Sequence, residues 1–211
     1  MTRILIADDH PFVRYGVKHA LEDEFPGIEI GEAASAPELL AQAGKMPWDM
    51  VVLDLTMPGR SGLDALHELK ALRPDIRVLV LSMHPEDQFA VRVLRAGAAG
   101  YLTKESIPDE LVQAVRKILA GGKYIRSSVA DLLAAQIQQG DMDQPPHARL
   151  SDREFQVLAM IARGKTVTTI ADELSLSVKS ISTYRSRILE KLNLKTTADL
   201  ARYAVHHNLV E

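Results

Sequence analysis

The first 120 residues alternate short apolar runs with longer stretches whose apolar residues recur about every 3.6 positions. The runs MVVL at 50–53 and VLVL at 78–81 are apolar throughout, which is typical of strands buried on both faces of a parallel sheet. Strands are predicted at 3–7, 28–32, 50–53, 78–81 and 101–102, and helices at 11–24, 37–45, 63–72, 86–96 and 108–120. This alternation predicts a doubly wound α/β domain with a five-stranded parallel sheet.

The alternation stops at Gly121-Gly122. Residues 128–139 have helical periodicity and predict a connector helix, whereas 140–149 (GDMDQPPHAR) contain a proline pair and no apolar anchors. Such a composition is typical of an exposed, mobile tether. We therefore predict a first domain over 1–121, a connector and linker over 122–149, and a second domain over 150–211.

The second domain is predicted to be entirely helical. Helices are expected at 152–163, 167–174, 178–192 and 198–207. Ser151 and Glu154 have the spacing of a capping box, and Thr166, Ser177 and Thr196 or Thr197 are further N-cap candidates. The expected architecture is a separate all-α four-helix domain.

The composition narrows the class of protein. The 211 residues are 46% hydrophobic and 25% charged, which is ordinary for a soluble globular chain. The absence of Cys excludes disulfides, thiolate metal sites and thiol catalysis. The N-terminus lacks the apolar segment of a signal peptide, and no apolar run approaches the roughly 18 residues that span a bilayer. We expect a cytoplasmic protein with no membrane partner.

The net charge of −3 is unevenly distributed. Residues 150–211 carry a net charge of +2, and residues 1–149 carry −5. A mildly basic C-terminal part is compatible with nucleic-acid binding, although a net charge this small does not establish it.

Polar side chains follow the predicted strands where each strand ends. They are Asp8, Asp9, Asp54, Ser82 and Lys104. Because ligands of open parallel sheets bind beyond the carboxyl ends of the strands, we expect these side chains to converge. Converging carboxylates repel one another unless a cation lies among them, and oxygen ligands suit a hard ion such as Mg²⁺. The hydroxyl and the ammonium would then face a second anion, for which phosphate is the natural candidate. The alternative is a set of independent strand-end caps.

His10, His19 and His67 are interpreted as helix-surface residues rather than ligands.

Four segments resemble the receiver domain of two-component response regulators. They are DDH at 8–10, LDLTMPGRSG at 53–62, LSMH at 81–84 and GYLTKES at 100–106, in the same order and spacing. The resemblance implies a flavodoxin-like sheet with strand order 2-1-3-4-5. It also implies a sensor histidine kinase as partner, because receivers accept a phosphoryl group from such kinases.

The resemblance assigns roles to individual residues. Asp54 is the implied phospho-acceptor, and Lys104 the lysine that contacts the transferred group. Ser82 and Tyr101 stand at the two switch positions. The implied ligands of Mg²⁺ (or Mn²⁺) are Asp8, Asp9, Asp54 and the backbone carbonyl of Thr56. Glu105 departs from the proline that many receivers have after the lysine.

The segment from Ala171 through Ile181 predicts a helix, a short turn at 175–177 and a second helix, which is a helix-turn-helix arrangement. On the second helix the apolar residues Ile181, Ile188, Leu189 and Leu192 form one stripe. The opposite face carries short polar and basic side chains, which suit entry into the major groove. A merely solvated face remains the alternative on this ground alone.

Residues 150–194 resemble the LuxR-type DNA-binding domain, so the chain as a whole resembles a NarL/FixJ-family regulator. The segments LSDRE at 150–154 and LEKLNL at 189–194 carry this match, and STYRSRILEKL at 182–192 is closer to the branch of BvgA- and GacA-like regulators. Ser182 stands where the family commonly has lysine, and Thr183-Tyr184-Arg185 where it commonly has Asn-His-Arg. The operator sequence therefore does not follow from the resemblance.

Candidate DNA contacts follow from these positions. Base-edge candidates are Lys179, Ser182, Thr183 and Ser186. Phosphate candidates are Lys165, Thr168, Thr169, Arg185 and Arg187. Arg185 is the weakest candidate, because an ideal helical wheel places it near the buried stripe.

The sequence thus predicts a response-regulator transcription factor rather than an enzyme. Phosphorylation of Asp54 would promote dimerisation or release the DNA-binding domain, and the homodimer would bind double-stranded promoter DNA. RNA polymerase is a further partner that a regulator of this kind could contact. The alternatives are a DNA binder indifferent to phosphorylation, an adaptor acting through protein contacts and, less favoured, an enzyme with an aspartyl-phosphate intermediate. A phosphatase of that last kind needs a second Asp at the position of Thr56.

Overall fold

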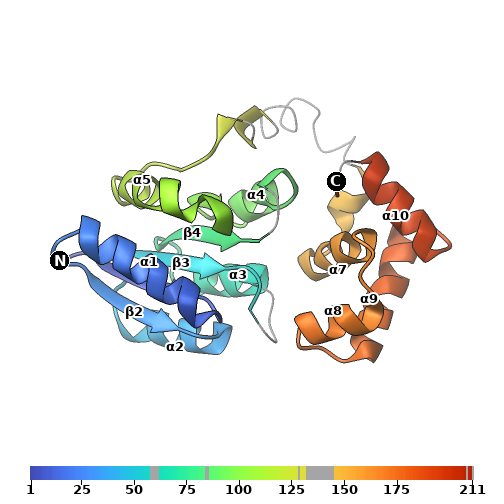
Figure 1. Cartoon of the computed structure of the whole chain (residues 1–211), viewed down its shortest axis with the longest axis horizontal. Coiled ribbons are helices and arrows are strands. Elements are labelled where there is room, and N and C mark those ends of the chain that lie inside the picture. The colour runs from blue at the N-terminus through green and yellow to red at the C-terminus, as the bar shows by residue number, and fades with distance from the viewer. Residues whose placement is uncertain (58–61, 84–85, 128, 132–144, 208, 211) are drawn as a thin grey trace. The chain divides into compact units, whose positions relative to one another are not determined.

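The structure of the chain is a computed structural model that describes residues 1–57, 62–83, 86–127, 129–131, 145–207 and 209–210. The chain folds as two compact units, residues 1–135 and 136–211 (Figure 1). Among the described residues, no helix combines the length and the apolar character that crossing a bilayer requires.

The N-terminal unit contains a five-stranded parallel sheet with strand order β2-β1-β3-β4-β5. The strands are β1 (Arg3–Ala7), β2 (Glu29–Ala33), β3 (Met50–Asp54), β4 (Arg77–Ser82) and β5 (Gly100–Thr103). β3 is buried along its whole length, as its apolar sequence predicts. The predicted sheet and its strand order are confirmed, and several strands extend one or two residues further than predicted.

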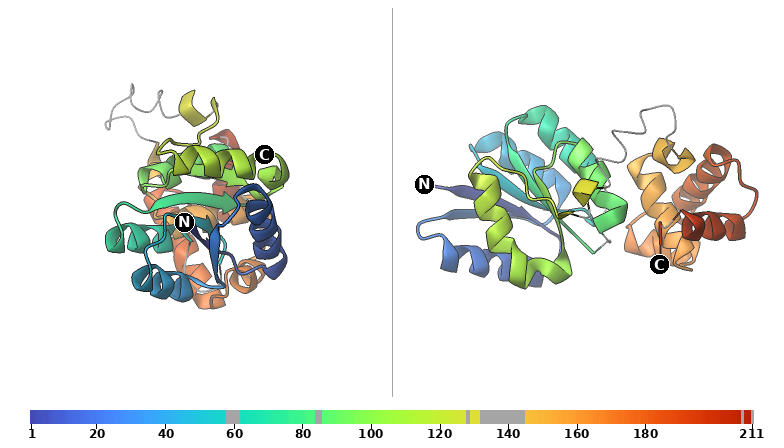
Figure 2. Two further views of the ribbon diagram at one scale, coloured as in Figure 1. Left: turned by 90° about the vertical axis from the view of Figure 1, so that its left-hand side faces the viewer. Right: turned by 90° about the horizontal axis from the view of Figure 1, so that it is seen from above.

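Helices cover both faces of this sheet (Figure 2). They are α1 (Pro11–Glu24), α2 (Ala36–Lys45), α3 (Gly62–Leu72), α4 (Glu86–Arg95) and α5 (Ile107–Leu119), with a short 3₁₀ helix η1 (Lys104–Ser106) before α5. α1 packs against α5, and α2 packs against α3. Because strand side chains alternate between faces, Ile4, Val52 and Leu81 reach the core beneath α1 and α5, whereas their neighbours along each strand face the other way.

Gly62 begins α3 directly beneath the end of β3. Its N–H donates a hydrogen bond to the carbonyl of Leu55 over 3.0 Å. A Cβ at this position would lie 2.3 Å from Leu55 Cα and 2.5 Å from the Asp54 carbonyl oxygen. Since both are backbone atoms, only a glycine allows the loop after Asp54 to keep this path.

We therefore expect Gly62→Ala to lower the free energy of unfolding by about 2 kcal/mol, because overpacked positions cannot relax cheaply. Urea denaturation of the N-terminal transition measures the change. Gly16→Ala is the matched control, since a Cβ at Gly16 meets no atom within 4 Å. Replacing an unhindered helical glycine should hold or raise stability. Equal effects of the two substitutions would contradict the steric account.

The C-terminal unit contains the four predicted helices. They are α7 (Asp152–Ala162), α8 (Val167–Glu173), α9 (Val178–Lys191) and α10 (Thr197–His206). α7 packs against α9 and α10, and α8 packs against α9. The buried Ile170, Ile181 and Leu200 contribute to the core between the helices.

The starts of these helices follow the capping chemistry that the sequence predicts. Ser151 and Glu154 form a complete capping box on α7, and Thr196 rather than Thr197 caps α10. The side chains of Thr166 and Ser177 accept hydrogen bonds from the backbone N–H three residues further on. Lys191 at the end of α9 forms a 2.7 Å ion pair with Glu154, which ties that helix to the first turn of α7.

The segment between the units differs in part from the prediction. Tyr124 forms a bridge with Gly100 of β5, and its hydroxyl donates to Glu110, so the start of the predicted connector packs on the N-terminal unit. Residues 146–149, predicted as mobile tether, form a 3₁₀ helix η3 (Pro146–Arg149). There His147 hydrogen-bonds Tyr203 at 3.0 Å. Residues 129–131 are helical, and the rest of the predicted connector helix and the start of the tether lie outside the described residues.

Candidate functional site

Three strand ends bring acidic side chains and one lysine together at the carboxyl edge of the sheet. Asp8 follows β1, Asp54 ends β3 and Lys104 follows β5. Lys104 Nζ lies 2.7 Å from Asp8 Oδ2 and 2.9 Å from Asp54 Oδ2. All three side chains are nearly or fully buried. Three of the five side chains that were expected to converge therefore meet here, and an ammonium bridges two carboxylates.

Both oxygens of Asp54 are engaged by donors. Oδ1 accepts a hydrogen bond of 3.0 Å from the backbone N–H of Thr56, and Oδ2 accepts one from Lys104. Burial raises the pKa of the Asp54 carboxyl, and the neighbouring Asp8 raises it further, against the opposing effect of Lys104. Burial alone would lower the pKa of Lys104, but its contacts with Asp54 and Asp8 raise it above its ordinary value of 10.5. The lysine is therefore a permanent cation beside the carboxylates.

This edge of the sheet has the donor set of a site for a hard cation. Asp8, Asp9, His10 and Asp54 each offer one ligand atom, and these atoms lie within 4.8 Å of one another. Asp8 is 1% exposed, and its Oδ2 accepts no hydrogen bond from a described residue although it forms an ion pair with Lys104. Three carboxylates facing one ammonium leave uncompensated negative charge, which a divalent ion bound through oxygen atoms would balance. The residues present thus fit Mg²⁺.

The remaining residues predicted for this site lie on β4, on β5 and in the loop after β3. Ser82 is fully buried at the end of β4, and Tyr101 is buried within β5. β4 pairs with β5 so that Val80 faces Tyr101 and Ser82 faces Thr103. The hydroxyl of Thr56 is buried and has no hydrogen-bond partner among the described residues.

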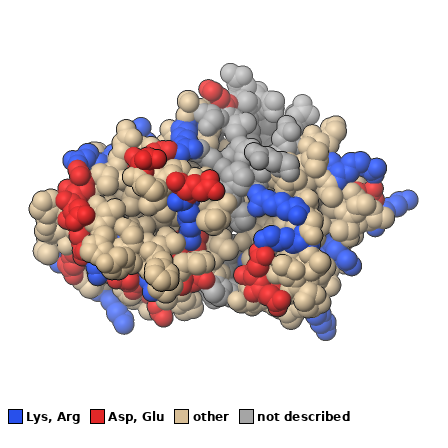
Figure 3. Space-filling view, in the orientation of Figure 1, with Lys and Arg blue, Asp and Glu red and all other residues tan. Residues whose placement is uncertain are grey.

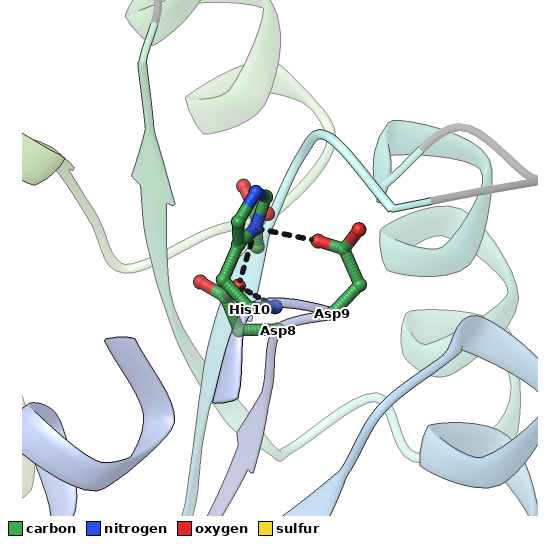
Figure 4. Close-up of side chains that lie close together, drawn as sticks. Asp8, Asp9 and His10 are labelled. Atoms are coloured by element: carbon green, nitrogen blue, oxygen red, sulfur yellow. Dashed lines mark hydrogen bonds and ion pairs between the residues drawn. The ribbon is translucent and has the colours of Figure 1, made fainter. Parts of the chain in front are cut away.

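His10 is exposed at the start of α1, in agreement with its interpretation as a helix-surface residue, but its ring also contacts the aspartates. Its Nδ1 lies 2.8 Å from Asp9 Oδ1 and 3.2 Å from Asp8 Oδ1 (Figure 4). Pro11 indicates in the sequence where α1 begins. It leaves His10 before the helix, as the N-cap residue in an extended conformation. His10 therefore remains at the strand end with the aspartates.

The raised pKa of Asp54 predicts a pH-dependent effect of Asp54→Asn on stability. Ionising a carboxyl whose pKa is raised by folding costs folding free energy at neutral pH, and this cost vanishes below the ordinary carboxyl value of 3.8. Without metal, we expect the variant to unfold about 2–5 °C higher than the parent chain at neutral pH, and at the same temperature near about pH 4. Thermal unfolding at the two pH values measures this. A variant less stable than the parent at neutral pH would contradict the cause given for the raised pKa.

A second candidate site lies in the C-terminal unit, where α8 and α9 form a helix-turn-helix. α8 ends at Glu173, and Ser175 adopts a positive φ of 51° in the turn before Ser177 caps α9. Ile181 and Ile188 of α9 are fully buried, so the face of α9 on the opposite side is turned outward.

The outward face of α9 carries most of the predicted base-edge candidates. Lys179, Thr183 and Ser186 are exposed, and Ser182 is half-buried. The hydroxyl of Thr183 donates to the Lys179 carbonyl, and that of Ser186 donates to the Ser182 carbonyl. Their oxygen lone pairs and methyl group remain available to a ligand.

Some of the side chains predicted to contact DNA phosphates are exposed, and others already contact protein groups. Arg187, Thr168 and Thr169 are exposed. Lys165 forms a 2.5 Å ion pair with Glu173, so its charge is already partly compensated. Arg185 is half-buried and its Nε is buried without a hydrogen-bond partner among the described residues, in agreement with its place beside the apolar stripe.

The net charge of +2 on residues 150–211 does not by itself identify a DNA-binding surface. Figure 3 shows Lys and Arg side chains on the C-terminal unit with acidic side chains among them. On the N-terminal unit the two signs are likewise interspersed. The helix-turn-helix geometry, rather than the net charge, therefore identifies α9 as the candidate recognition helix.

Comparisons with known protein families match both units. A family model described as "Response regulator receiver domain" matches residues 4–116. A second, described as "Bacterial regulatory proteins, luxR family", matches residues 148–204. The acidic edge lies within the first match, and α8 and α9 lie within the second.

Similar proteins are known along the full length of the chain. The chain is 42% identical to "Response regulator GacA" of Pseudomonas viridiflava, covering 100% of this chain and 99% of the relative. It is 36% identical to "Response regulator UvrY" of Escherichia coli (strain K12), covering 99% and 96%. Among solved structures, RcsB from Salmonella enterica serovar Typhimurium bound to promoter rprA with phosphomimetic BeF3⁻ matches with a TM-score of 0.64 at 29% identity, covering 96% and 97%. A structure of two RcsB dimers bound to two parallel DNAs matches with a TM-score of 0.58 at 28% identity, covering 100% and 99%.

Proposed function

This chain belongs to the response regulators that join a receiver domain to a LuxR-type DNA-binding domain, and on that premise we propose that phosphorylation of Asp54 controls its binding to promoter DNA. The proposed donor is a sensor histidine kinase. In this proposal the receiver domain covers residues 1–121, a connector and linker cover 122–149, and the DNA-binding domain covers 150–211.

One observation carries the proposal, namely the bridge from Lys104 to two buried carboxylates. A buried aspartate with a raised pKa is costly to the fold, and a purely structural role does not require it. Lys104 Nζ already lies 2.9 Å from Asp54 Oδ2, where it would meet a phosphoryl oxygen attached to that carboxylate. Perturbed ionisable groups gathered at the ligand-binding edge of a parallel sheet are typical of a functional site.

The proposed reaction is a phosphoryl transfer. An oxygen of Asp54 attacks the phosphorus of a phosphohistidine, the new O–P bond forms, and the P–N bond breaks with its electron pair returning to the imidazole, which takes up a proton. Lys104 then exchanges its carboxylate contacts for the phosphoryl oxygens and stabilises their charge. The backbone N–H of Thr56 holds the attacking carboxylate in position through Oδ1.

The same residues would hold the metal that such a transfer needs. Asp8, Asp9, Asp54 and the Thr56 carbonyl are the proposed ligands of Mg²⁺ or Mn²⁺. When bound, the ion would neutralise negative charge on the transferring group. The chain's own part is to supply oxygen ligands and one fixed ammonium at a buried edge.

Ser82 and Tyr101 are the proposed switch residues. The buried hydroxyl of Ser82 stands at the end of β4, one residue beyond Leu81, which pairs with Asp54. A phosphoryl group on Asp54 would draw this hydroxyl inward, and the Tyr101 ring would follow into the vacated space. The altered face around α4, β5 and α5 would then favour a homodimer.

DNA binding is assigned to α9. Lys179, Ser182, Thr183 and Ser186 are proposed to contact base edges in the major groove. Lys165, Thr168, Thr169, Arg187 and, more weakly, Arg185 are proposed to contact phosphates.

We place the protein in the cytoplasm as a transcription regulator that accepts a phosphoryl group, and RNA polymerase is a proposed further contact.

The proposal is tested by mapping DNA bound in cells and measuring affinity for the recovered fragments, with and without an acyl-phosphate donor and Mg²⁺. We expect phosphorylation to raise the affinity of the full chain by about tenfold, which is about 1.4 kcal/mol. The Asp54→Asn variant should show no such increase. If donor treatment phosphorylates the protein but leaves its affinity and its sites unchanged, DNA binding is independent of phosphorylation and the proposed switch is wrong.

A further inference from the structure

The imidazole of His10 faces the aspartates instead of capping its own helix. His10 is the N-cap residue of α1, and its side chain makes no capping hydrogen bond. Its Nδ1 lies 2.8 Å from Asp9 Oδ1 and 3.2 Å from Asp8 Oδ1, and Figure 4 shows the ring turned toward both carboxylates. The side chain thus adds a nitrogen to a set of oxygen atoms.

The contact between His10 and Asp9 does not have the geometry of a hydrogen bond. Asp9 Oδ1 is buried and has no hydrogen-bond partner among the described residues, although Nδ1 lies only 2.8 Å away. Nδ1 also makes a 3.2 Å hydrogen bond with Asp8 Oδ1, so a cation held between this nitrogen and the carboxylates would take the place of the proton on Nδ1. The ligand atoms of Asp8, Asp9, His10 and Asp54 lie within 4.8 Å of one another, which is close enough for one ion to contact several of them.

Lys104 contacts Asp8 at a different oxygen atom from the one that His10 contacts. Lys104 approaches Asp8 at Oδ2, whereas His10 approaches it at Oδ1. Arg14 donates to the Asp8 carbonyl and forms an ion pair with Glu32. A cation beside His10 would therefore meet Asp8 and Asp9 without displacing Lys104.

The ligand atoms of the site determine which cation it binds more tightly. Mg²⁺ prefers oxygen ligands, whereas a neutral imidazole is a good ligand for Zn²⁺ and other first-row transition cations. We propose that His10 is a nitrogen ligand at the acidic edge, so that the site binds borderline cations such as Zn²⁺ more tightly than a site of oxygens alone. The inference deepens the metal site of the proposed function and rests on it.

The test compares metal binding by the untagged full chain and by His10→Gln, which keeps a polar side chain of similar length. Calorimetric titration with Zn²⁺ alone and with Mg²⁺ alone gives the two affinities. We expect His10→Gln to lower the Zn²⁺ affinity by about tenfold or more and to lower the ratio of Zn²⁺ to Mg²⁺ affinity accordingly. Because the chain has no Cys, thiolates contribute nothing to the Zn²⁺ signal.

His19→Gln is the matched control. His19 is exposed on α1, and its ring meets the Tyr15 ring edge to face with 4.4 Å between the ring centroids. Zn²⁺ binding by this variant should equal that of the parent chain. Asp9→Asn should weaken both Zn²⁺ and Mg²⁺ binding, which shows that both ions use the acidic edge.

A spectroscopic measurement separates ligation from mere proximity. With Mn²⁺ bound, pulsed electron paramagnetic resonance detects the nitrogen of a coordinated imidazole, and we expect that signal in the parent chain and not in His10→Gln. An unchanged Zn²⁺ affinity in His10→Gln, or a nitrogen signal that persists without His10, would overturn the proposal. Phosphorylation of the parent chain with Mg²⁺ tests the proposed function separately, so either idea can fail while the other stands.

Discussion

Replacing Asp54 by Asn should abolish phosphorylation of the full chain by a small acyl phosphate in the presence of Mg²⁺. The amide keeps the shape of the side chain but lacks the nucleophilic oxygen anion, and the loss should be at least about three orders of magnitude in rate. Intact-protein mass spectrometry over a time course detects the phosphorylated species. The same measurement locates the group, because peptide mapping after reduction with borohydride marks an acyl phosphate at its aspartate.

Asp23→Asn is the matched control for this loss. Asp23 lies exposed on α1, so the substitution removes the same charge away from the acidic edge, and phosphorylation should match that of the parent chain. Lys104→Ala should retain the nucleophile but lose the cation that lies 2.9 Å from it, and we expect slower transfer rather than none. Undiminished phosphorylation of Asp54→Asn would move the acceptor to another residue and remove the central assignment.

Replacing both Lys179 and Thr183 by Ala should lower the affinity for specific DNA by about ten- to a hundredfold. Both side chains lie exposed on the outward face of α9, and each base-edge contact contributes about 1–3 kcal/mol to discrimination. Fluorescence anisotropy on fragments recovered from the genome-wide map measures the affinity. Mutated fragments should distinguish the parent chain from the variant, because loss of base contacts lowers specificity as well as affinity.

Lys195→Ala is the control for the lost charge. Lys195 is exposed between α9 and α10, outside the helix-turn-helix, so its removal should change affinity far less than the double substitution. The circular-dichroism spectrum of each variant should match the parent, since none of these side chains is buried. If Lys195→Ala weakens binding as much as the double variant does, the recognition face has been assigned to the wrong helix surface.

The sequence predicted a doubly wound α/β domain because the runs that form β3 and β4 are apolar throughout, and the resemblance to receiver domains added the strand order. A short, continuously apolar run such as the one in β3 is typical of a strand in the interior of a parallel sheet. The amphipathic helices between such runs bury their apolar faces against that sheet. Asp54 and Lys104 could be assigned to one site because the carboxyl ends of parallel strands meet at one edge. The helix-turn-helix was equally readable, since Ser177 marks the start of α9 by its capping chemistry.

Local patterns did not predict the contacts made between segments distant in the chain or across a turn. His10 is exposed as predicted, but its contacts with the aspartates were not predicted, because they depend on the path of the chain from β1 into α1. The need for glycine at position 62 depends on the Asp54–Leu55 backbone lying directly against it. Lys165 was predicted as a candidate for a phosphate contact, but its ion pair with Glu173 of α8 was not predicted.

The sequence by itself determined the elements, the two folds and the set of chemical groups at the sheet edge. These follow from periodicity, capping and the topology of parallel strands, which are local or nearly local rules. Only the tertiary structure decided how those groups share the site: Lys104 takes one oxygen of each buried aspartate, and His10 approaches the other oxygen of Asp8. Distances of this kind depend on the packing of several segments at once, because a side chain's partners are set by backbone positions that no short stretch of sequence specifies.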